Sequence, residues 1–281
     1  MRWNHGIIIG LSWCIEFGVI LPLEDRGTSQ ADQMLDLKTM AKRIPGLRSA
    51  VGFARRRYAQ LAMGSKPGVN IFTDVFRENK WGGIESFSGK GSDLLQTTVI
   101  RRQLPLLCRE FEIRSMLDIP CGDFNWMKHV DLGTIAYTGA DVVGDLIAHN
   151  SRYETSNTHF CSLNLLKHKL PKVDLVFCRD CLVHFSFRDS FAALRNICES
   201  GSTYLLTTTF TSHRRNHNIP TGSWHPLNLE YPPFSFPPPL KLINEECTQS
   251  DGTYMDKSLG LWNVADIGAC LKKSFTDTDA S

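Results

Sequence analysis

Two aspartates and a glycine have the spacing of a ligand-binding turn. Asp118 lies in a short apolar run that stops at a turn containing Gly122. An apolar run bounded by Gly and Pro predicts a buried strand, and a strand that stops at a tight glycine turn before a helical stretch is typical of nucleotide-binding α/β proteins. Asp141 follows Gly122 by 19 residues, at the end of a second predicted strand over 135–142. A carboxylate at that separation can accept both hydroxyls of a ribose.

Further polar side chains follow a predicted strand over 173–178. Arg179 and Asp180 come directly after this strand, and His184 lies a few residues further on. Because open α/β sheets bind ligands beyond the carboxyl ends of their strands, we expect Arg179 and Asp180 to reach the ligand crevice. His184 is either a catalytic base or a histidine that packs in the core or caps a helix.

The order of these features resembles the motifs of class I S-adenosylmethionine-dependent methyltransferases, over about residues 93–265. Asp118 and Gly122 match the acid and the second glycine of the first motif, whereas Pro120 and Phe124 stand where its other glycines occur. The resemblance implies an α/β, Rossmann-like fold, which is a seven-stranded, mostly parallel sheet with helices on both faces. It implies S-adenosyl-L-methionine as methyl donor and catalytic roles for His184 and Asp180. The implied donor-binding residues are Asp118, Pro120, Cys121, Gly122, Asp123, Asp141, Asn164 and Arg179.

Two of these residues carry finer expectations. In the family that the chain resembles, an acid after the third strand commonly contacts the adenine amine. Here Asn164 follows the predicted strand over 158–163, and its carbonyl oxygen can accept the same hydrogen bond. Gly122 is the one glycine kept in the first motif, so we expect the backbone to approach the donor most closely there.

The other elements are predicted from composition and periodicity. Predicted helices cover 31–63 with a break at Pro45 and Gly46, 71–80, a stretch from Asp93 that is kinked or restarted at Pro105, 124–130, 144–153 and 187–198. Predicted strands cover 203–210, 240–247 and 259–264. The resemblance implies that the last two strands form an antiparallel hairpin at the edge of the sheet.

Two loops carry large side chains. Residues 81–92 contain four glycines together with Trp81 and Phe87, and they either cover a ligand or form a surface connection. Residues 211–239 contain seven of the thirteen prolines, a density that excludes a helix. This segment is either a lid over the methyl acceptor, which Arg214 and Arg215 would contact, or an extended strap packed by its aromatic residues.

The composition fits a globular chain. Among 281 residues, 42% are hydrophobic and 21% are charged, and the net charge is +2, so no global field favours nucleic acid. We predict an N-terminal apolar segment and helical extension over 1–63, followed by a methyltransferase-like domain over 64–281. The sequence gives no indication of the oligomeric state.

Cysteines and the N-terminus bear on the cellular setting. Nine scattered cysteines predict reduced thiols, and we expect a cytoplasmic protein. Cys178, Cys181 and His184 have no fourth ligand nearby, so no metal site is predicted. The apolar run 6–23 is interrupted by Glu16. It is a signal anchor that would attach the chain to a membrane, a buried helix, or non-native sequence from an upstream start.

The predicted function is methyl transfer from S-adenosyl-L-methionine to an unidentified small-molecule acceptor. One alternative is an NAD-dependent oxidoreductase, but Pro120, Asp123 and Phe124 are poor neighbours for a pyrophosphate, because Asp123 would repel its charge. Another alternative is a non-enzymatic nucleoside-binding module on the same fold, since a fold does not imply an activity.

Overall fold

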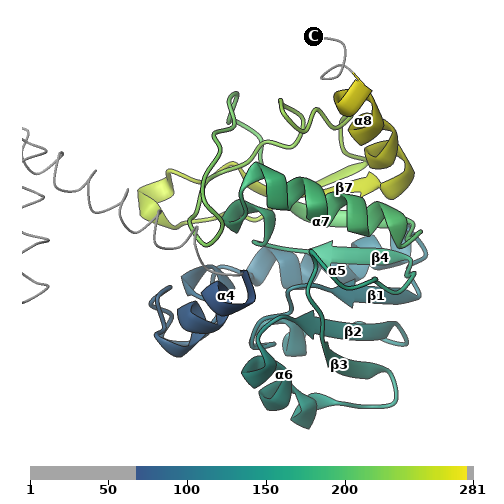
Figure 1. Ribbon diagram of the computed structural model, residues 1–281. Coiled ribbons are helices and arrows are strands. Elements are labelled where there is room, and N and C mark those ends of the chain that lie inside the picture. Colours follow the sequence, from purple (N-terminus) through teal and green to yellow (C-terminus); the bar gives the residue numbers. More distant parts are fainter. Residues whose placement is uncertain (1–67, 277–281) are drawn as a thin grey trace, which may run out of the picture. The chain divides into compact units, whose positions relative to one another are not determined.

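The computed structural model describes residues 68–276 (Figure 1). The predicted extension over 1–63 and its apolar run 6–23 lie outside these residues, so the division of the chain at residue 63 stays a prediction. Among the helices between residues 68 and 276, none combines the length and the apolar character that crossing a bilayer requires.

One seven-stranded sheet forms the centre of the described domain, in the order β3-β2-β1-β4-β5-β7-β6. Strands β1 to β5 are parallel, and β7 runs antiparallel to both of its neighbours. This seven-stranded, mostly parallel sheet with an antiparallel hairpin at one edge is the predicted one, so the predicted fold is confirmed. The strands are β1 Ser115–Asp118, β2 Ala136–Asp141, β3 Thr158–Ser162, β4 Leu175–Cys178, β5 Tyr204–Phe210, β6 Lys241–Asn244 and β7 Lys257–Asn263.

Helices cover both faces of the sheet (Figure 1). The α-helices are α4 Gly68–Arg77, α5 Thr98–Glu110, α6 Gly144–Asn150, α7 Phe187–Glu199 and α8 Val264–Thr276. Short 3-10 turns are η1 Lys90–Ser92, η2 Met127–His129, η3 Ser151–Tyr153, η4 Leu182–His184 and η5 Ser250–Gly252. Successive strand residues point to opposite faces. Leu117 therefore packs with α7 and α8 in one core, while Met116 packs with α5 in the other.

The predicted helix around Pro105 differs from the observed one. Helix α5 begins at Thr98, not at Asp93, and it runs without interruption through Pro105. A proline removes one backbone hydrogen bond from a helix. Leu104 and Leu107 on either side of Pro105 are buried against the sheet, and this packing keeps the helix continuous.

The predicted helix over 124–130 is wrong. In the described stretch between β1 and β2, only the turn η2 has helical geometry. Phe124 adopts a positive φ of 57°, which a helix cannot contain. Its ring packs between Tyr137 and Phe160, so tertiary packing overrides the local pattern.

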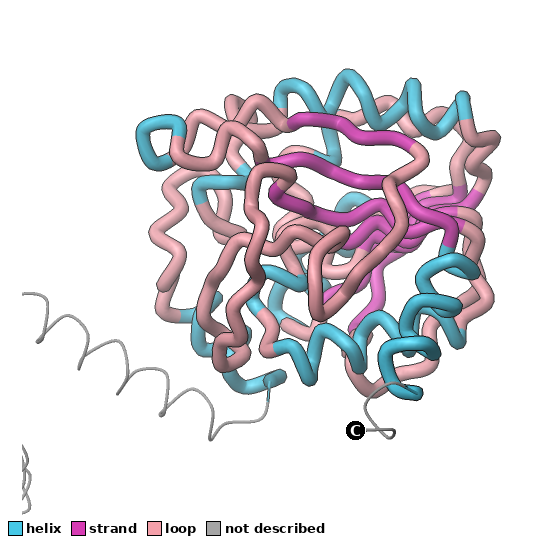
Figure 2. The backbone as a smooth tube through the Cα atoms, turned by 90° about the horizontal axis from the view of Figure 1, so that it is seen from above, coloured by secondary structure: helices cyan, strands magenta, loops and turns pink. Residues whose placement is uncertain are grey.

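Residues 211–239 contain no helix, as their prolines predict, and most of the segment is a strap. Leu227, Leu229 and Phe234 are fully buried, and Phe234 packs on the rings of Phe187 and Phe191 of α7. The strap alternative therefore describes most of this segment. Figure 2 shows many of the loops gathered at one end of the strands, and the arrowheads in Figure 1 point to this end.

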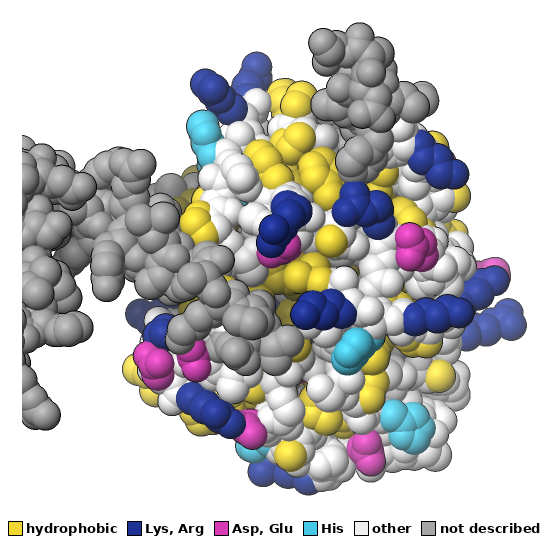
Figure 3. Space-filling model, viewed as in Figure 1, with side chains coloured by type: hydrophobic (Ala, Val, Ile, Leu, Met, Phe, Trp, Pro, Cys, Tyr) yellow, Lys and Arg dark blue, Asp and Glu magenta, His cyan; other side chains and the backbone are white. Residues whose placement is uncertain are grey.

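The face shown in Figure 3 carries basic and acidic side chains interspersed among polar and apolar ones. Such mixing is typical of a solvated surface and produces no single-sign field on that face.

Candidate functional site

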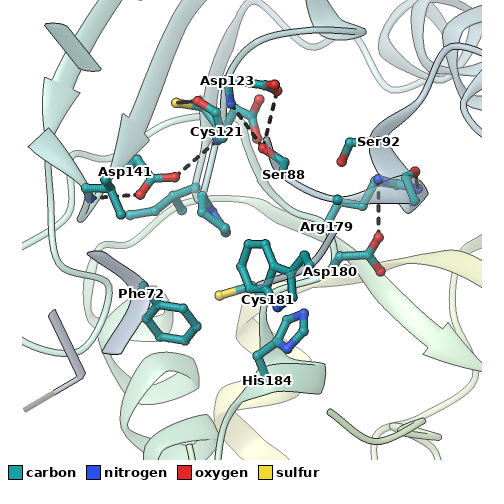
Figure 4. Close-up of a pocket in the computed structure, with 18 of the residues that line it drawn as sticks. Phe72, Ser88, Ser92, Cys121, Asp123, Asp141, Arg179, Asp180, Cys181 and His184 are labelled. Carbon is teal, nitrogen blue, oxygen red and sulfur yellow. Dashed lines mark hydrogen bonds and ion pairs between the residues drawn. The ribbon is translucent and has the colours of Figure 1, made fainter. Parts of the chain in front are cut away.

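A cavity of about 690 Å³ lies at the carboxyl ends of the parallel strands. Its size falls in the range of small-molecule sites, roughly 300–1,000 Å³. The cavity spans the point where the strand order reverses between β1 and β4, which is where open α/β sheets bind ligands. All predicted site residues line its wall: Asp118, Pro120, Cys121, Gly122, Asp123, Asp141, Asn164, Arg179, Asp180 and His184. Figure 4 labels six of them, Cys121, Asp123, Asp141, Arg179, Asp180 and His184.

Asp141 ends β2 and is held in one orientation. Its Oδ2 accepts a hydrogen bond from the backbone N–H of Gly122 at 3.1 Å, and its Oδ1 accepts one from Val143 at 2.9 Å. Burial raises the pKa of this carboxyl to about 6, although the backbone N–H groups work against the rise. Each carboxylate oxygen keeps a further lone pair for a ligand hydroxyl.

Asp118 ends β1 beside the same cavity and is buried. The hydroxyl of Tyr137 donates to its Oδ2 at 2.6 Å. Burial raises the pKa of Asp118 to about 8, and the hydrogen bond from Tyr137 opposes this rise. Asp118 is therefore mostly protonated at neutral pH, so its carboxyl can both donate and accept a hydrogen bond.

Gly122 has a positive φ of 57°, a backbone conformation that glycine adopts without the steric penalty of a side chain. A Cβ added there would collide with Ser88 Oγ. The space that a side chain at residue 122 would enter is therefore taken by Ser88, and the close approach of the donor to the backbone of Gly122 stays a prediction. Asn150 Nδ2 donates to the Gly122 carbonyl at 2.8 Å and fixes the turn from its other side.

Asp123 fastens residues 81–92, here called the cap segment, over the cavity. Its carboxylate accepts hydrogen bonds from Ser86 Oγ at 3.0 Å and from the backbone N–H of Phe87 at 2.8 Å. Its own N–H donates to Ser88 Oγ at 3.1 Å. Trp81 and residues 87–92 line the cavity, so the cap segment covers the site. The Asp123 carboxylate and N–H already bind the cap segment, so a contact of Asp123 with a ligand would be additional to these hydrogen bonds.

Asn164 lies at the cavity wall just after β3, as expected. Its Oδ1 already accepts a hydrogen bond from the backbone N–H of Leu166 at 2.8 Å. A carbonyl oxygen has a second lone pair, so the predicted contact to an adenine amine stays open.

Four charged residues form a buried network at the ends of β4, β6 and β7. Arg179 contacts Glu245 at 2.7 Å and Asp180 at 3.2 Å. Lys257 contacts Asp180 at 2.6 Å and Glu245 at 3.3 Å. The Arg179 guanidinium also donates to the carbonyl of Gly91 in the cap segment at 2.8 Å. Arg179 is thus a second fastener of the cap segment.

Asp180 stays ionised in this network. Burial disfavours its charge, but Lys257 and Arg179 hold the pKa of the carboxyl well below its usual range. A group of such low basicity makes a poor proton acceptor at neutral pH. This low basicity argues against Asp180 as a proton acceptor, and its catalytic role stays a prediction.

His184 faces the cavity from η4 with a defined tautomer (Figure 4). Its Nδ1 lies 2.9 Å from the carbonyl oxygen of Ser223, and because a carbonyl only accepts, Nδ1 carries the proton and Nε2 is the free acceptor. Burial lowers the pKa of His184, against smaller opposing effects of Ser223 and Asp180. The imidazole is neutral at pH 7 and can accept a proton.

The strap positions this histidine. The backbone N–H of Gly222 donates to the carbonyl of His184 at 2.8 Å, and that of His225 donates to Val183 at 3.0 Å. Within the strap, Trp224 reaches the cavity. Arg214 and Arg215 instead line a separate surface depression with His213 and Asp256, so the expectation that these arginines contact the acceptor is not met.

Sequence reasoning missed Glu245 and Lys257. Each is a single charged residue near the end of a predicted strand, and nothing local distinguishes it from a solvated side chain. Between residues 68 and 276, no group of three or more His, Cys, Asp or Glu residues is arranged to hold a metal ion. Cys178 and Cys181 are buried free thiols.

Comparison with known proteins finds remote structural likeness. No protein-family model matches the chain, and no curated protein sequence matches it. Among solved structures, N-methyltransferase NodS from Bradyrhizobium japonicum with S-adenosyl-L-homocysteine matches 68% of this chain and 98% of its own, at 12% identity and a TM-score of 0.49. Magnesium protoporphyrin IX methyltransferase from Synechocystis matches 42% of this chain and 57% of its own, at 14% identity and a TM-score of 0.35.

Human N-acetylserotonin methyltransferase with bound SAM matches 73% of this chain and 65% of its own, at 14% identity and a TM-score of 0.40. The alignments with the Synechocystis and the human enzyme thus cover less than two thirds of those enzymes. At such low identity, the likeness concerns the fold alone.

Proposed function

We propose that this chain transfers a methyl group from S-adenosyl-L-methionine to a small-molecule acceptor. The observation that carries the proposal is the oriented carboxylate of Asp141 at the end of β2, beside the Gly122 turn, in a cavity of about 690 Å³. A buried carboxylate in this position is suited to the two hydroxyls of a ribose.

The residues present fit such a donor. Asp118, Asp141 and Asn164 line one half of the cavity with acceptor oxygens for the polar groups of a nucleoside. Apolar side chains of Val143, Leu146 and nearby residues supply the contact surface for a base. The donor supplies an electrophilic methyl group when bound, and the protein orients the acceptor and excludes water.

The residues that follow β4 would act on the acceptor. His184 Nε2 accepts the proton that an acceptor loses, and the Ser223 carbonyl holds the ring in the tautomer that makes this possible. Asp180 stays anionic and orients polar groups of the acceptor. General-base assistance of this kind contributes about 10²–10⁴-fold in rate.

The first alternative, a dinucleotide enzyme, fits the turn poorly. A pyrophosphate needs unpaired backbone N–H groups at the turn and at the start of a helix. Here the N–H of Gly122 is bonded to Asp141 and that of Asp123 to Ser88. The described stretch after the turn holds only η2, so it presents no α-helix start.

The test is calorimetric titration of the full chain and of Asp141→Ala with S-adenosyl-L-methionine. Loss of a charge-assisted contact to both ribose hydroxyls should weaken binding by about 2–3 kcal/mol, which is roughly 30- to 150-fold. Asp145→Ala is the matched control, because Asp145 is exposed on α6 and pairs with Arg77. It should leave the affinity unchanged.

Thermal unfolding run beside the titration shows whether Asp141→Ala folds. Unchanged affinity in a folded Asp141→Ala variant would remove the ribose assignment. Methyl transfer to any acceptor separates an enzyme from a binding module.

A further inference from the structure

The acceptor half of the cavity has an aromatic wall at its mouth. Phe210, Trp224 and Tyr254 form a cluster with ring centroids 4.9–5.9 Å apart, and all of them line the cavity. Trp224 remains 40% exposed. A large ring held by two neighbours and open on its remaining surface is a preformed platform for the apolar face of a ligand ring.

The wall of the same cavity also offers hydrogen-bond acceptors. Asp180 uses Oδ2 for both Lys257 and Arg179, while its Oδ1 has only a long contact of 3.4 Å with Thr208 Oγ1. The second acceptor is His184 Nε2, because Nδ1 is bound to Ser223. Two acceptors without a strong protein donor suit a ligand that brings its own donors, and hydroxyl groups are such donors.

The charges around this half are balanced. Arg179 and Lys257 are paired with Asp180 and Glu245, and the pKa of His184 is lowered by burial. An anionic or cationic ligand would enter without a free counter-charge from this network and would have to lose its hydration. Outside this network the described wall carries two further cations, Lys90 of the cap segment and Lys167, and both are exposed to solvent.

We propose that the methyl acceptor is an uncharged ring compound that carries hydroxyl groups, seated against Trp224 with one hydroxyl at His184 Nε2 and a neighbouring hydroxyl at Asp180 Oδ1. Neutral sugars and phenols both combine an uncharged ring with hydroxyl groups. The inference rests on the proposed function.

The reaction is an O-methylation. The hydroxyl proton goes to His184 Nε2 as a bond forms between the oxygen and the methyl carbon. The bond between methyl carbon and sulfur breaks, and its electron pair stays on the sulfur, which leaves S-adenosyl-L-homocysteine, a methyl ether and a protonated imidazole.

The experiment uses the full chain with a panel of probes in matched pairs. Neutral members are methyl glycosides of hexoses and deoxyhexoses, and phenols such as catechol. Charged partners are the corresponding uronic acids, sugar phosphates, amino sugars and benzoates. Binding is measured by calorimetry in saturating S-adenosyl-L-homocysteine, and turnover by transfer of a labelled methyl group.

At least one neutral hydroxylated ring should bind and be methylated on oxygen, at least tenfold better than its charged partners. Activity confined to glycosides assigns a sugar, and activity confined to phenols assigns a phenol. Trp224→Ala should raise the KM of that acceptor by roughly 10- to 100-fold, as expected for an aromatic anchor. Donor affinity should not change.

Tyr231→Ala is the control, because Tyr231 lies on the same strap with similar exposure, 36%, and is not part of the cavity wall. It should leave the KM unchanged. Preferred turnover of a charged partner, methylation on nitrogen, or no binding of any neutral ring by a chain that binds the donor overturns the inference. Failure to bind the donor overturns the proposed function instead.

Discussion

Removal of the Glu245 carboxylate charge should destabilise the protein strongly. Glu245 is 1% exposed and faces Arg179 at 5% and Lys257 at 7% exposure. Glu245→Gln keeps the shape of the side chain but leaves two buried cations to share Asp180. Breaking a buried ion pair from one side costs about 3–5 kcal/mol.

The lower end of this range applies here, because Asp180 remains as a partner and its side chain is 27% exposed to the cavity. A loss of about 3 kcal/mol in a domain of about 200 residues lowers Tm by roughly 6–12 °C. Urea and thermal denaturation measure the change. Glu110→Gln is the control, since Glu110 pairs with Lys241 on the surface at 50% and 42% exposure. It should cost at most about 1 kcal/mol.

A charge-balanced double variant sharpens the test. Combining Glu245→Met with Lys257→Met leaves Arg179 paired with Asp180 and removes the surplus charge, so the double variant should be more stable than Glu245→Gln. If Glu245→Gln costs no more than Glu110→Gln, the network does not hold the ends of β4, β6 and β7 together, and the reasoning is refuted.

Three further predictions concern the cavity. The pKa of Asp118 is raised from near 4 in the unfolded chain to about 8, so the folded state binds the extra proton. Its contribution to stability is full below pH 4 and is lost as pH rises to 8. Denaturation at several pH values should show this slope, and Asp118→Asn should flatten it between pH 6 and 8. Asp123→Ala releases Ser86, Ser88 and the backbone of residue 87, so hydrogen exchange in the cap segment should accelerate at least tenfold; unchanged protection would show that other contacts hold it. His184→Gln should lower kcat by about 10²–10⁴-fold with donor affinity retained, and the acid limb of the wild-type rate profile should lie below pH 6.5, because the pKa of His184 is lowered; a variant with full activity excludes His184 as base.

The local sequence pattern predicted most of the strands and helices of the fold. The apolar run 173–178 contains β4, whose four residues are all buried, and the periodicity over 187–198 matches α7, which Ser186 caps by accepting from Asp189. Asp141 was placed correctly at the end of its strand, because the alternation of strand and turn fixes where a strand stops.

The partners of the site residues could not be predicted, because they are distant in sequence. Arg179 and Glu245 are separated by 66 residues, and Asp180 and Lys257 by 77. The predicted helix after Gly122 failed for a related reason. Phe124 is the first residue of that predicted helix, but it packs on side chains of β2 and β3 with a backbone that no helix allows.

The central claim is that the cavity holds a nucleoside sulfonium donor, and titration of the full chain tests it most directly. S-adenosyl-L-methionine and S-adenosyl-L-homocysteine should each bind at one site per chain, and NAD should give no binding heat at the same concentration. Binding of NAD with no response to either sulfur compound, in a chain that unfolds cooperatively, would contradict the account.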